Sequence, residues 1–154
     1  MKAVLTRVKS ASVSIDGKVV GEIGKGFLIL LGVGPEDTEK ECRYLVEKTL
    51  GLRVFEDENG KMNLSLADVG GQVLVVSQFT LYGNCRKGRR PSFTDAAGPE
   101  LGNAMYERFL AICQELGYPP QHGQFGADMQ VASINDGPVT LILDTDQLMD
   151  TPRR

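Results

Sequence analysis

The run from Phe27 to Val33 is the feature that most limits what this chain can fold into. Its residues are apolar nearly throughout, and turn-forming residues flank it at Gly24-Lys25-Gly26 and Gly34-Pro35. A strand with one face in water alternates apolar and polar residues, so an uninterrupted apolar run predicts a strand that is buried on both faces. Val73–Val76 is a second wholly apolar run, and it carries the same prediction.

The remaining pattern places two helices between groups of strands. Asp37 or Thr38 is a candidate N-cap for a helix that ends at Gly51. A second helix is expected from Pro99 until Gly117 stops it. Further strands are expected at residues 2–8, 13–15, 19–23, 52–55, 64–66, 121–125, 129–134 and 139–143, followed by a frayed tail from Asp144. This order predicts an α+β fold with a mixed, mainly antiparallel, barrel-like sheet and two main helices.

Length and composition favour one cytoplasmic domain over residues 1–154. The net charge is −3, and the chain shows no membrane-spanning run and no signal peptide. Three widely spaced cysteines, together with His122 as the single histidine, argue against a zinc site and against a disulfide framework. The acidic residues 56–58 lack the spacing of a calcium loop and are interpreted as a solvated hairpin tip. We therefore expect neither a metal nor another cofactor.

Asn135-Asp136-Gly137-Pro138 places four turn-forming residues in a row between two apolar runs. A turn between two strands is the simplest interpretation. The bond before a proline is the one peptide bond that becomes cis at modest cost, about 0.5–1 kcal/mol. Two alternatives stay open: a plain turn with the commoner trans proline, and a cis turn that points its carbonyl oxygens in an unusual direction.

Ser77-Gln78-Phe79-Thr80 lies where the second buried strand ends. Backbone N–H groups at such an end can form an oxyanion hole. Ser77 or Thr80 as a nucleophile would need a base, but His122 lies far along the chain and no Gly-x-Ser-x-Gly turn is present. A polar strand end without catalytic function is the alternative.

Arg86-Lys87-Gly88-Arg89-Arg90 holds four cations in five residues, and Arg153-Arg154 ends the chain. A solvated loop is the simple interpretation of such a cluster, and contact with nucleic-acid phosphates is the functional one.

These segments resemble the D-aminoacyl-tRNA deacylase family. Its two signature motifs are matched, in the right order, by Ser77–Leu81 and Asn135–Thr140. The similarity covers essentially the whole chain, with further matching segments at residues 1–17, 26–33, 90–93 and 125–129.

The resemblance implies a homodimer with a barrel-like α+β fold. It implies hydrolysis of the ester that joins a D-amino acid to the 3′ end of tRNA, which recycles mischarged tRNA. It also implies that the bond between Gly137 and Pro138 is cis, and that this dipeptide enters the pocket of the other subunit. Its carbonyl oxygens would hold the substrate ammonium group, so that an L side chain strikes the backbone and a D side chain does not. Glycine has no side chain, so we expect its ester to be hydrolysed as well.

By the same resemblance, the 2′-hydroxyl of the terminal adenosine assists water, and backbone N–H groups near Phe79 and Thr80 hold the oxyanion. Thr80 as nucleophile is the competing alternative. The resemblance assigns catalysis to Ser77, Gln78, Phe79 and Thr80. It assigns substrate and tRNA binding to Asn135, Val139, Thr140, Arg86, Lys87, Arg89 and Arg90. A non-catalytic nucleic-acid-binding protein on this fold is the second interpretation, and a serine-type esterase is the third.

Overall fold

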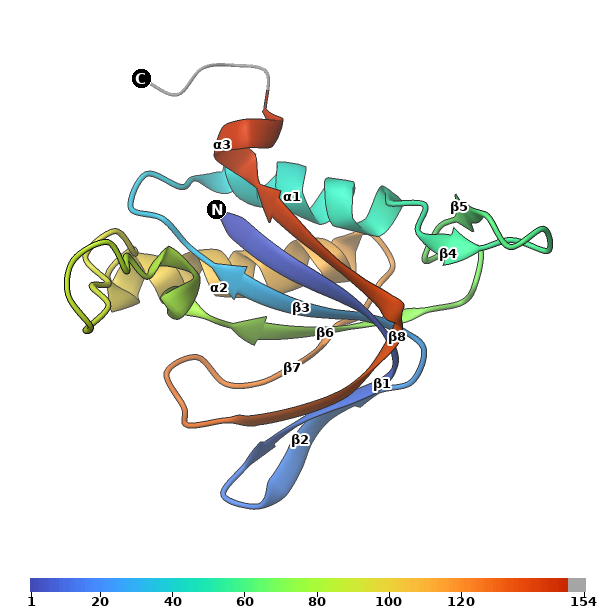
Figure 1. Ribbon diagram of the computed structural model, residues 1–154, viewed down its shortest axis with the longest axis horizontal. Coiled ribbons are helices and arrows are strands. Elements are labelled where there is room, and N and C mark those ends of the chain that lie inside the picture. Colours follow the sequence, from blue (N-terminus) through green and yellow to red (C-terminus); the bar gives the residue numbers. More distant parts are fainter. Residues whose placement is uncertain (150–154) are drawn as a thin grey trace.

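The computed structural model describes residues 1–149, and Figure 1 shows a strongly curled sheet with two long helices packed against one face. The fold is mixed α+β with a barrel-like sheet, as the sequence predicts. Its elements in chain order are β1 (Lys2–Ile15), β2 (Lys18–Ile23), β3 (Gly26–Gly32), α1 (Glu39–Gly51), β4 (Phe55–Glu56), β5 (Met62–Leu64), β6 (Gln72–Ser77), the 3-10 helix η1 (Phe79–Tyr82), α2 (Pro99–Glu115), β7 (Gln121–His122), β8 (Gln130–Asp144) and α3 (Thr145–Leu148).

β1 organises the sheet because two strands share one of its edges. Its residues 2–8 pair antiparallel with β3, its residues 11–15 pair antiparallel with β2, and β8 pairs antiparallel with it along the other edge. β6 pairs with β3, and β7 pairs with β6, both in parallel. The long connection through α1 between β3 and β6 allows this parallel pairing.

The sheet curls until β2 lies beside β7. The backbone N–H of Glu22 donates to Gln121 Oε1 at 3.3 Å. A Cβ on Gly21 would stand only 2.8 Å from the carbonyl oxygen of His122. Glycine is therefore needed where the two strands approach each other, and the barrel is nearly closed.

β3 and β6 are buried on both faces, so the prediction from their apolar runs is confirmed. Alternate residues of the two strands belong to two different hydrophobic clusters. One cluster packs against α1 and α2, and it includes Phe27, Ile29, Leu31, Val73 and Val75. The other lies inside the curl of the sheet, and it includes Leu28, Leu74 and Val76.

Both predicted helices are confirmed. The Thr38 hydroxyl accepts from Lys40 N at 3.3 Å, and the Glu41 carboxylate accepts from Thr38 N at 2.7 Å. This reciprocal cap fixes the start of α1. Pro99 occupies the first turn of α2, and Gly117 beyond its end adopts a φ of +91°, which favours glycine.

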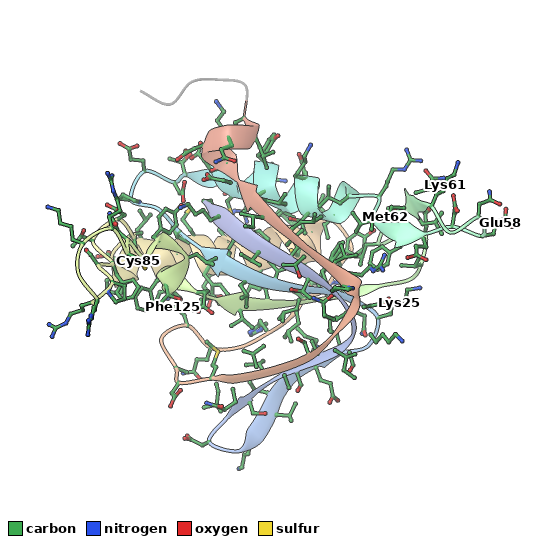
Figure 2. All side chains as sticks on the ribbon, in the orientation of Figure 1. Lys25, Glu58, Lys61, Met62, Cys85 and Phe125 are labelled. Carbon is green, nitrogen blue, oxygen red and sulfur yellow. The ribbon has the colours of Figure 1, made fainter. Side chains whose placement is uncertain are left out.

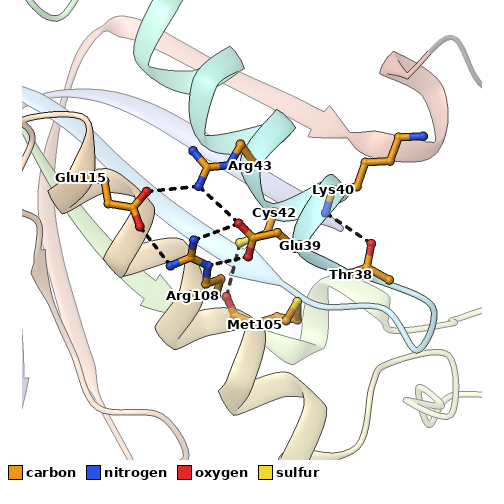
Figure 3. A network of polar contacts seen from close by, with 8 residues as sticks. All are labelled: Thr38, Glu39, Lys40, Cys42, Arg43, Met105, Arg108 and Glu115. Atoms are coloured by element: carbon orange, nitrogen blue, oxygen red, sulfur yellow. Dashed lines mark hydrogen bonds and ion pairs between the residues drawn. The ribbon is translucent and has the colours of Figure 1, made fainter.

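Ion pairs join the two helices at the surface (Figure 3). Arg43 and Arg108 each contact both Glu39 and Glu115. Hydrogen bonding from Arg108 lowers the pKa of the Glu39 carboxyl group. All four side chains are substantially exposed, so this network contributes less to stability than the apolar contacts beneath it.

Several expected element boundaries are wrong. The strands expected at residues 52–55 and 64–66 are replaced by β4 and β5, which form a separate two-stranded sheet. β7 ends at His122 and does not extend to Phe125. In the tail expected to fray from Asp144, Thr145–Leu148 forms α3 instead. Arg153-Arg154 lies outside the described residues, and no helix within residues 1–149 is long and apolar enough to cross a membrane.

Long-range contacts explain the order at α3. The ammonium group of Met1 donates to the Thr145 hydroxyl and to the Asp37 carboxylate, both at 2.9 Å. Met1, Asp37 and Thr145 are all buried. These contacts join both ends of the described chain to the start of α1, and nothing in the local sequence indicates them.

Candidate active site

A cavity of about 500 Å³ lies beside the end of β6. Ser77, Gln78 and Phe79 form one wall, and residues 125–129 form another. Asp128 is the one charged residue among the described residues that line it. The remaining lining residues are Val76, Ala97, Pro99 and Val131. A cavity of this kind suits a compact, largely apolar group that is oriented by a few polar atoms.

Two backbone N–H groups beside this cavity have no hydrogen-bond partner among residues 1–149. They belong to Phe79 and Thr80, at the start of η1. The neighbouring N–H groups are used, because Gln78 N donates to Leu31 O at 2.7 Å and Leu81 N donates to Gln78 O at 3.1 Å. The two groups without partners can donate to an oxygen that becomes negatively charged in the cavity.

The hydroxyl of Thr80 accepts a hydrogen bond from Gln78 Nε2. His122 pairs with Val75 on the neighbouring strand, two residues before the level of Ser77. Its Nδ1 lies 2.7 Å from Gly123 O, and it lines a different cavity from Ser77. His122 is therefore not placed as a base for Ser77 or Thr80, and the serine-type esterase interpretation loses the base that it requires.

The second motif is a bulge within one continuous strand, not a turn between two strands. Asn135 pairs with Val8 and Thr140 pairs with Thr6, so residues 136–139 stand opposite Arg7 alone. The predicted hairpin turn is therefore wrong. The Gly137–Pro138 bond is cis, so the trans alternative is wrong and the form implied by the resemblance is confirmed.

Asn135 closes this bulge. Its Oδ1 accepts from Val139 N at 3.0 Å, and its Nδ2 donates to Thr140 Oγ1 at 3.1 Å. The three residues that the resemblance assigned to substrate contact thus hold the motif together. Gly137 and Pro138 themselves are exposed.

Arg7 supports the bulge from below, and sequence reasoning missed it. Its side chain is only 4% exposed. Its Nε donates to Asp136 O at 2.9 Å, and its Nη1 donates to Val54 O at 2.6 Å. Ion pairs to Glu56 at 3.5 Å and to Asp136 at 3.7 Å balance its charge. A cation on the apolar side of an alternating strand was the signal in the sequence.

The two motifs lie apart within one chain. Ser77 pairs with Leu31, and Leu31 pairs with Ala3. The bulge stands opposite Arg7, four residues further along β1. Figure 1 shows the bend of β8 at the opposite end of the sheet from the loops that follow β6. Gly137 and Pro138 are accordingly absent from the lining of the cavity in their own chain.

The basic loop begins just beyond η1. Asn84 and Ser92 exchange backbone hydrogen bonds of 2.7 and 2.9 Å at its base. A second hollow of about 660 Å³ is lined by Asn84, Arg86, Lys87, Arg90 and Ser92. All four cations of the loop are exposed, and Arg89 alone is outside this lining. Figure 2 shows Cys85 and Phe125 at this end of the molecule, and Glu58, Lys61 and Met62 at the other end.

No cysteine within residues 1–149 lines the cavity at the end of β6. Cys42 and Cys113 are buried, and burial raises the pKa of each thiol to about 12. Cys85 is exposed in the basic loop. Within residues 1–149, no three His, Cys, Asp or Glu side chains are grouped so that they could hold a metal ion.

Comparison with known proteins gives consistent matches over almost the whole chain. A family model described as D-Tyr-tRNA(Tyr) deacylase matches residues 4–144. D-aminoacyl-tRNA deacylase of Desulfatibacillum aliphaticivorans is 61% identical over 145 residues, which cover 94% of this chain and 99% of that protein. D-aminoacyl-tRNA deacylase of Thermosipho africanus is 54% identical over 145 residues, which cover 94% and 97%.

Two solved structures share the fold. The structure named "c-Myc DNA Unwinding Element Binding Protein" matches with a TM-score of 0.88 at 45% sequence identity, over 94% of this chain and 98% of that one. "Structural Analysis of a probable eukaryotic D-amino acid tRNA deacylase" matches with a TM-score of 0.78 over 92% and 97%. At 19% identity, the second match establishes similarity of fold alone.

Proposed function

This chain belongs to the D-Tyr-tRNA(Tyr) deacylase family, and we propose that it hydrolyses the ester between a D-amino acid, or glycine, and the 3′ end of tRNA. The observation that carries this proposal is the cavity at the end of β6, where the N–H groups of Phe79 and Thr80 have no partner among the described residues. Since the family model spans residues 4–144, we propose that the whole chain acts as one domain. We also propose that it acts in the cytoplasm.

In the proposed reaction, water attacks the ester carbonyl carbon and the bond to the 3′-oxygen breaks. The two N–H groups stabilise the negative charge on the carbonyl oxygen in the transition state. The adjacent 2′-hydroxyl of the terminal adenosine assists water, and the leaving 3′-oxygen gains a proton. Gln78 positions the ribose or the base, and Ser77 contributes to the same wall. The products are a free D-amino acid and a tRNA with a free 3′-hydroxyl.

The competing nucleophile, Thr80, gains no support from its surroundings. Its hydroxyl is an acceptor from Gln78, and His122 faces a separate cavity. We expect Thr80→Ala to keep substantial activity in single-turnover hydrolysis. A loss of several orders of magnitude would show that the hydroxyl takes part in the chemistry.

The 2′-hydroxyl is tested separately on the substrate. A tRNA ending in 2′-deoxyadenosine and charged on its 3′-hydroxyl should be cleaved poorly by the unchanged protein. Cleavage at the normal rate would count against assistance by the substrate and leave the two N–H groups as the main catalytic element.

Selection for handedness is proposed to need a second copy of the chain. The exposed Gly137–Pro138 segment would enter the partner's cavity, where its carbonyl oxygens accept hydrogen bonds from the substrate ammonium group. A D side chain then points into open space, whereas an L side chain strikes backbone atoms. A twofold axis would complete both cavities in the same way.

Mixing two defective variants tests this arrangement. Gln78→Ala damages the cavity, and Gly137→Ala damages the segment that the chain donates. In a mixed dimer, the Gly137→Ala chain has an intact cavity and receives an intact segment from its partner. D-selective hydrolysis should therefore recover after the two variants are unfolded and refolded together. Recovery should be absent after the same treatment if each chain uses its own Gly137.

The basic loop is proposed to bind phosphates of the tRNA acceptor stem. Arg86, Lys87, Arg89 and Arg90 provide its charge. Reversing the charges of Arg86 and Arg90 should weaken tRNA binding and reduce the dependence of affinity on salt concentration. An unchanged salt dependence would identify the loop as an ordinary solvated surface.

The decisive assay compares loss of ester from matched D- and L-aminoacyl-tRNA incubated with the purified protein. Rapid loss of the D-ester alone supports the proposed function. A second candidate, nucleic-acid binding without catalysis, is favoured only by the similarity to a protein named for DNA binding. Tight DNA binding together with stable D-aminoacyl-tRNA would replace the first proposal with the second.

A further inference from the structure

Two aromatic rings are exposed in the described part of the chain, and they contact each other. Phe79 is 56% exposed and Phe93 is 36% exposed. Their ring centroids are 5.3 Å apart and their planes meet at 76°. Burying an apolar ring is favourable, so an exposed pair of rings is a candidate binding surface for another molecule.

The backbone fixes both rings. Phe79 begins η1 and forms part of the wall of the cavity. Phe93 follows Ser92, whose backbone pairs with Asn84 at the base of the basic loop. The Phe93 ring lies against Gly83, where a Cβ would stand 3.0 Å from Cε1. Glycine at this position therefore makes room for the ring.

Each ring of the aromatic pair is next to one of the two hollows already described. Phe79 lines the cavity at the end of β6. Ser92, next to Phe93, lines the hollow formed by Arg86, Lys87 and Arg90. A largely apolar cavity with Asp128 as its one charged residue among those described, an aromatic pair and a cationic hollow are thus neighbours. Single-stranded nucleic acid is bound by this combination, because bases stack on aromatic rings while cations contact the phosphates.

We propose that the base of the penultimate nucleotide of the tRNA stacks on the Phe79–Phe93 pair, while Arg86, Lys87 and Arg90 hold the phosphates on the 5′ side of that nucleotide. This inference rests on the proposed function, since the ester in the cavity places the terminal nucleotide at Phe79. Phe93 is then a positioning residue: it orients the unpaired end of the tRNA and does not touch the reacting atoms.

The test uses short single-stranded RNA with the sequence of a tRNA 3′ end, in which 2-aminopurine replaces the penultimate base. Stacking quenches the fluorescence of this base. We expect quenching with the unchanged protein and its loss with Phe93→Leu, together with a roughly ten-fold weaker Kd, as one stacked base predicts. Phe93→Trp should restore both. Tyr118 lines a separate hollow. The control variant Tyr118→Leu, which also replaces an aromatic ring, should therefore behave like the unchanged protein.

An abasic penultimate nucleotide provides the second arm. The unchanged protein and Phe93→Leu should then bind this RNA equally well. In hydrolysis of D-aminoacyl-tRNA, the effect of Phe93→Leu should appear in KM. Unchanged quenching with Phe93→Leu, or an affinity difference that persists with the abasic RNA, would overturn the inference. Failure of the unchanged protein to cleave D-aminoacyl-tRNA would overturn the proposed function, while the fluorescence result would still decide whether the base stacks on Phe93.

Discussion

Replacing Arg7 should both destabilise the fold and release the Gly137–Pro138 bulge. The guanidinium group is buried and donates to two carbonyl oxygens, Asp136 O at 2.9 Å and Val54 O at 2.6 Å. Hydrogen bonds that involve a charged group contribute about 1.5–3 kcal/mol each. The ion pair to Glu56 adds little, because that carboxylate is 55% exposed.

Arg7→Met keeps most of the side-chain volume and removes every donor. We therefore expect the free energy of unfolding to fall by about 3–6 kcal/mol, which is the sum of the two hydrogen bonds, because methionine retains most of the packing. Arg7→Lys keeps the charge but has a compact ammonium group instead of the planar fork. One of the two bonds should survive, so the loss should be about half as large.

Urea titration measures the stability of both variants, and the ratio of D- to L-aminoacyl-tRNA hydrolysis measures the position of the bulge. Arg7→Lys should remain folded and should cleave the L-ester faster relative to the D-ester than the unchanged protein does. Arg43→Lys, on the exposed side of α1, is the matched control and should change neither quantity. A loss of less than about 0.5 kcal/mol in Arg7→Lys, within the usual range for surface changes, together with an unchanged ratio, would refute this reasoning.

Three further predictions concern stability. Gly137→Ala should lower the free energy of unfolding by about 1–3 kcal/mol, because φ is +133° there, whereas Gly51→Ala, which meets no atom within 4 Å, should not. Asp37→Asn should cost about 3–5 kcal/mol, because the buried ammonium group of Met1 loses its charged partner. Stability should also fall as pH rises from about 9 toward 12: the buried Cys42 thiol, with its pKa raised to about 12, keeps its proton in the native state but loses it on unfolding. Urea titrations measure all three effects, and the pH slope should be smaller in Cys42→Ala.

Each of these predictions has its own contradicting result. Equal losses in the two glycine variants would mean that backbone conformation at Gly137 carries no cost. A change below about 1 kcal/mol in Asp37→Asn would show that the buried pair is nearly balanced by its desolvation. A pH slope that is the same with and without Cys42 would assign the alkaline loss to other groups.

Local signals in the sequence were sufficient where one element decides its own structure. The apolar runs of β3 and β6 and the proline of α2 act within a few residues and were predicted correctly; the cap of α1 is Thr38, one of the two candidates that the sequence offered. The bulge in β8 was not, because Asn135–Pro138 alone favours a turn. Pairing with β1 on both sides of the motif overrides that local preference, and such long-range pairing cannot be read from the motif itself.

The candidate site divides in the same way. Ser77–Phe79 was placed correctly at a strand end, because the buried strand before it was evident. The opposite wall, residues 125–129, and the support from Arg7 depend on which segments fold together in space. Similarity to the family was the signal in the sequence for residues 125–129. The signal for Arg7 was a charged residue in an apolar pattern. Neither signal indicates a contact partner.

The separation of the two motifs within one chain is what makes a second copy necessary to the proposed selection. From Ser77 to the bulge, the path crosses three strand pairings, β6 to β3, β3 to β1 and β1 to β8, and runs four residues along β1. At about 4.8 Å per strand and 3.3 Å per residue, the distance within the sheet is roughly 20 Å. Asn135 and Arg7 hold the bulge at its place, so it cannot cross that distance while β8 stays paired. In the proposed selection, a carbonyl oxygen of Gly137 or Pro138 that meets the substrate ammonium group would therefore come from a second copy of the chain, and a twofold axis would supply one to each cavity without any change in the fold.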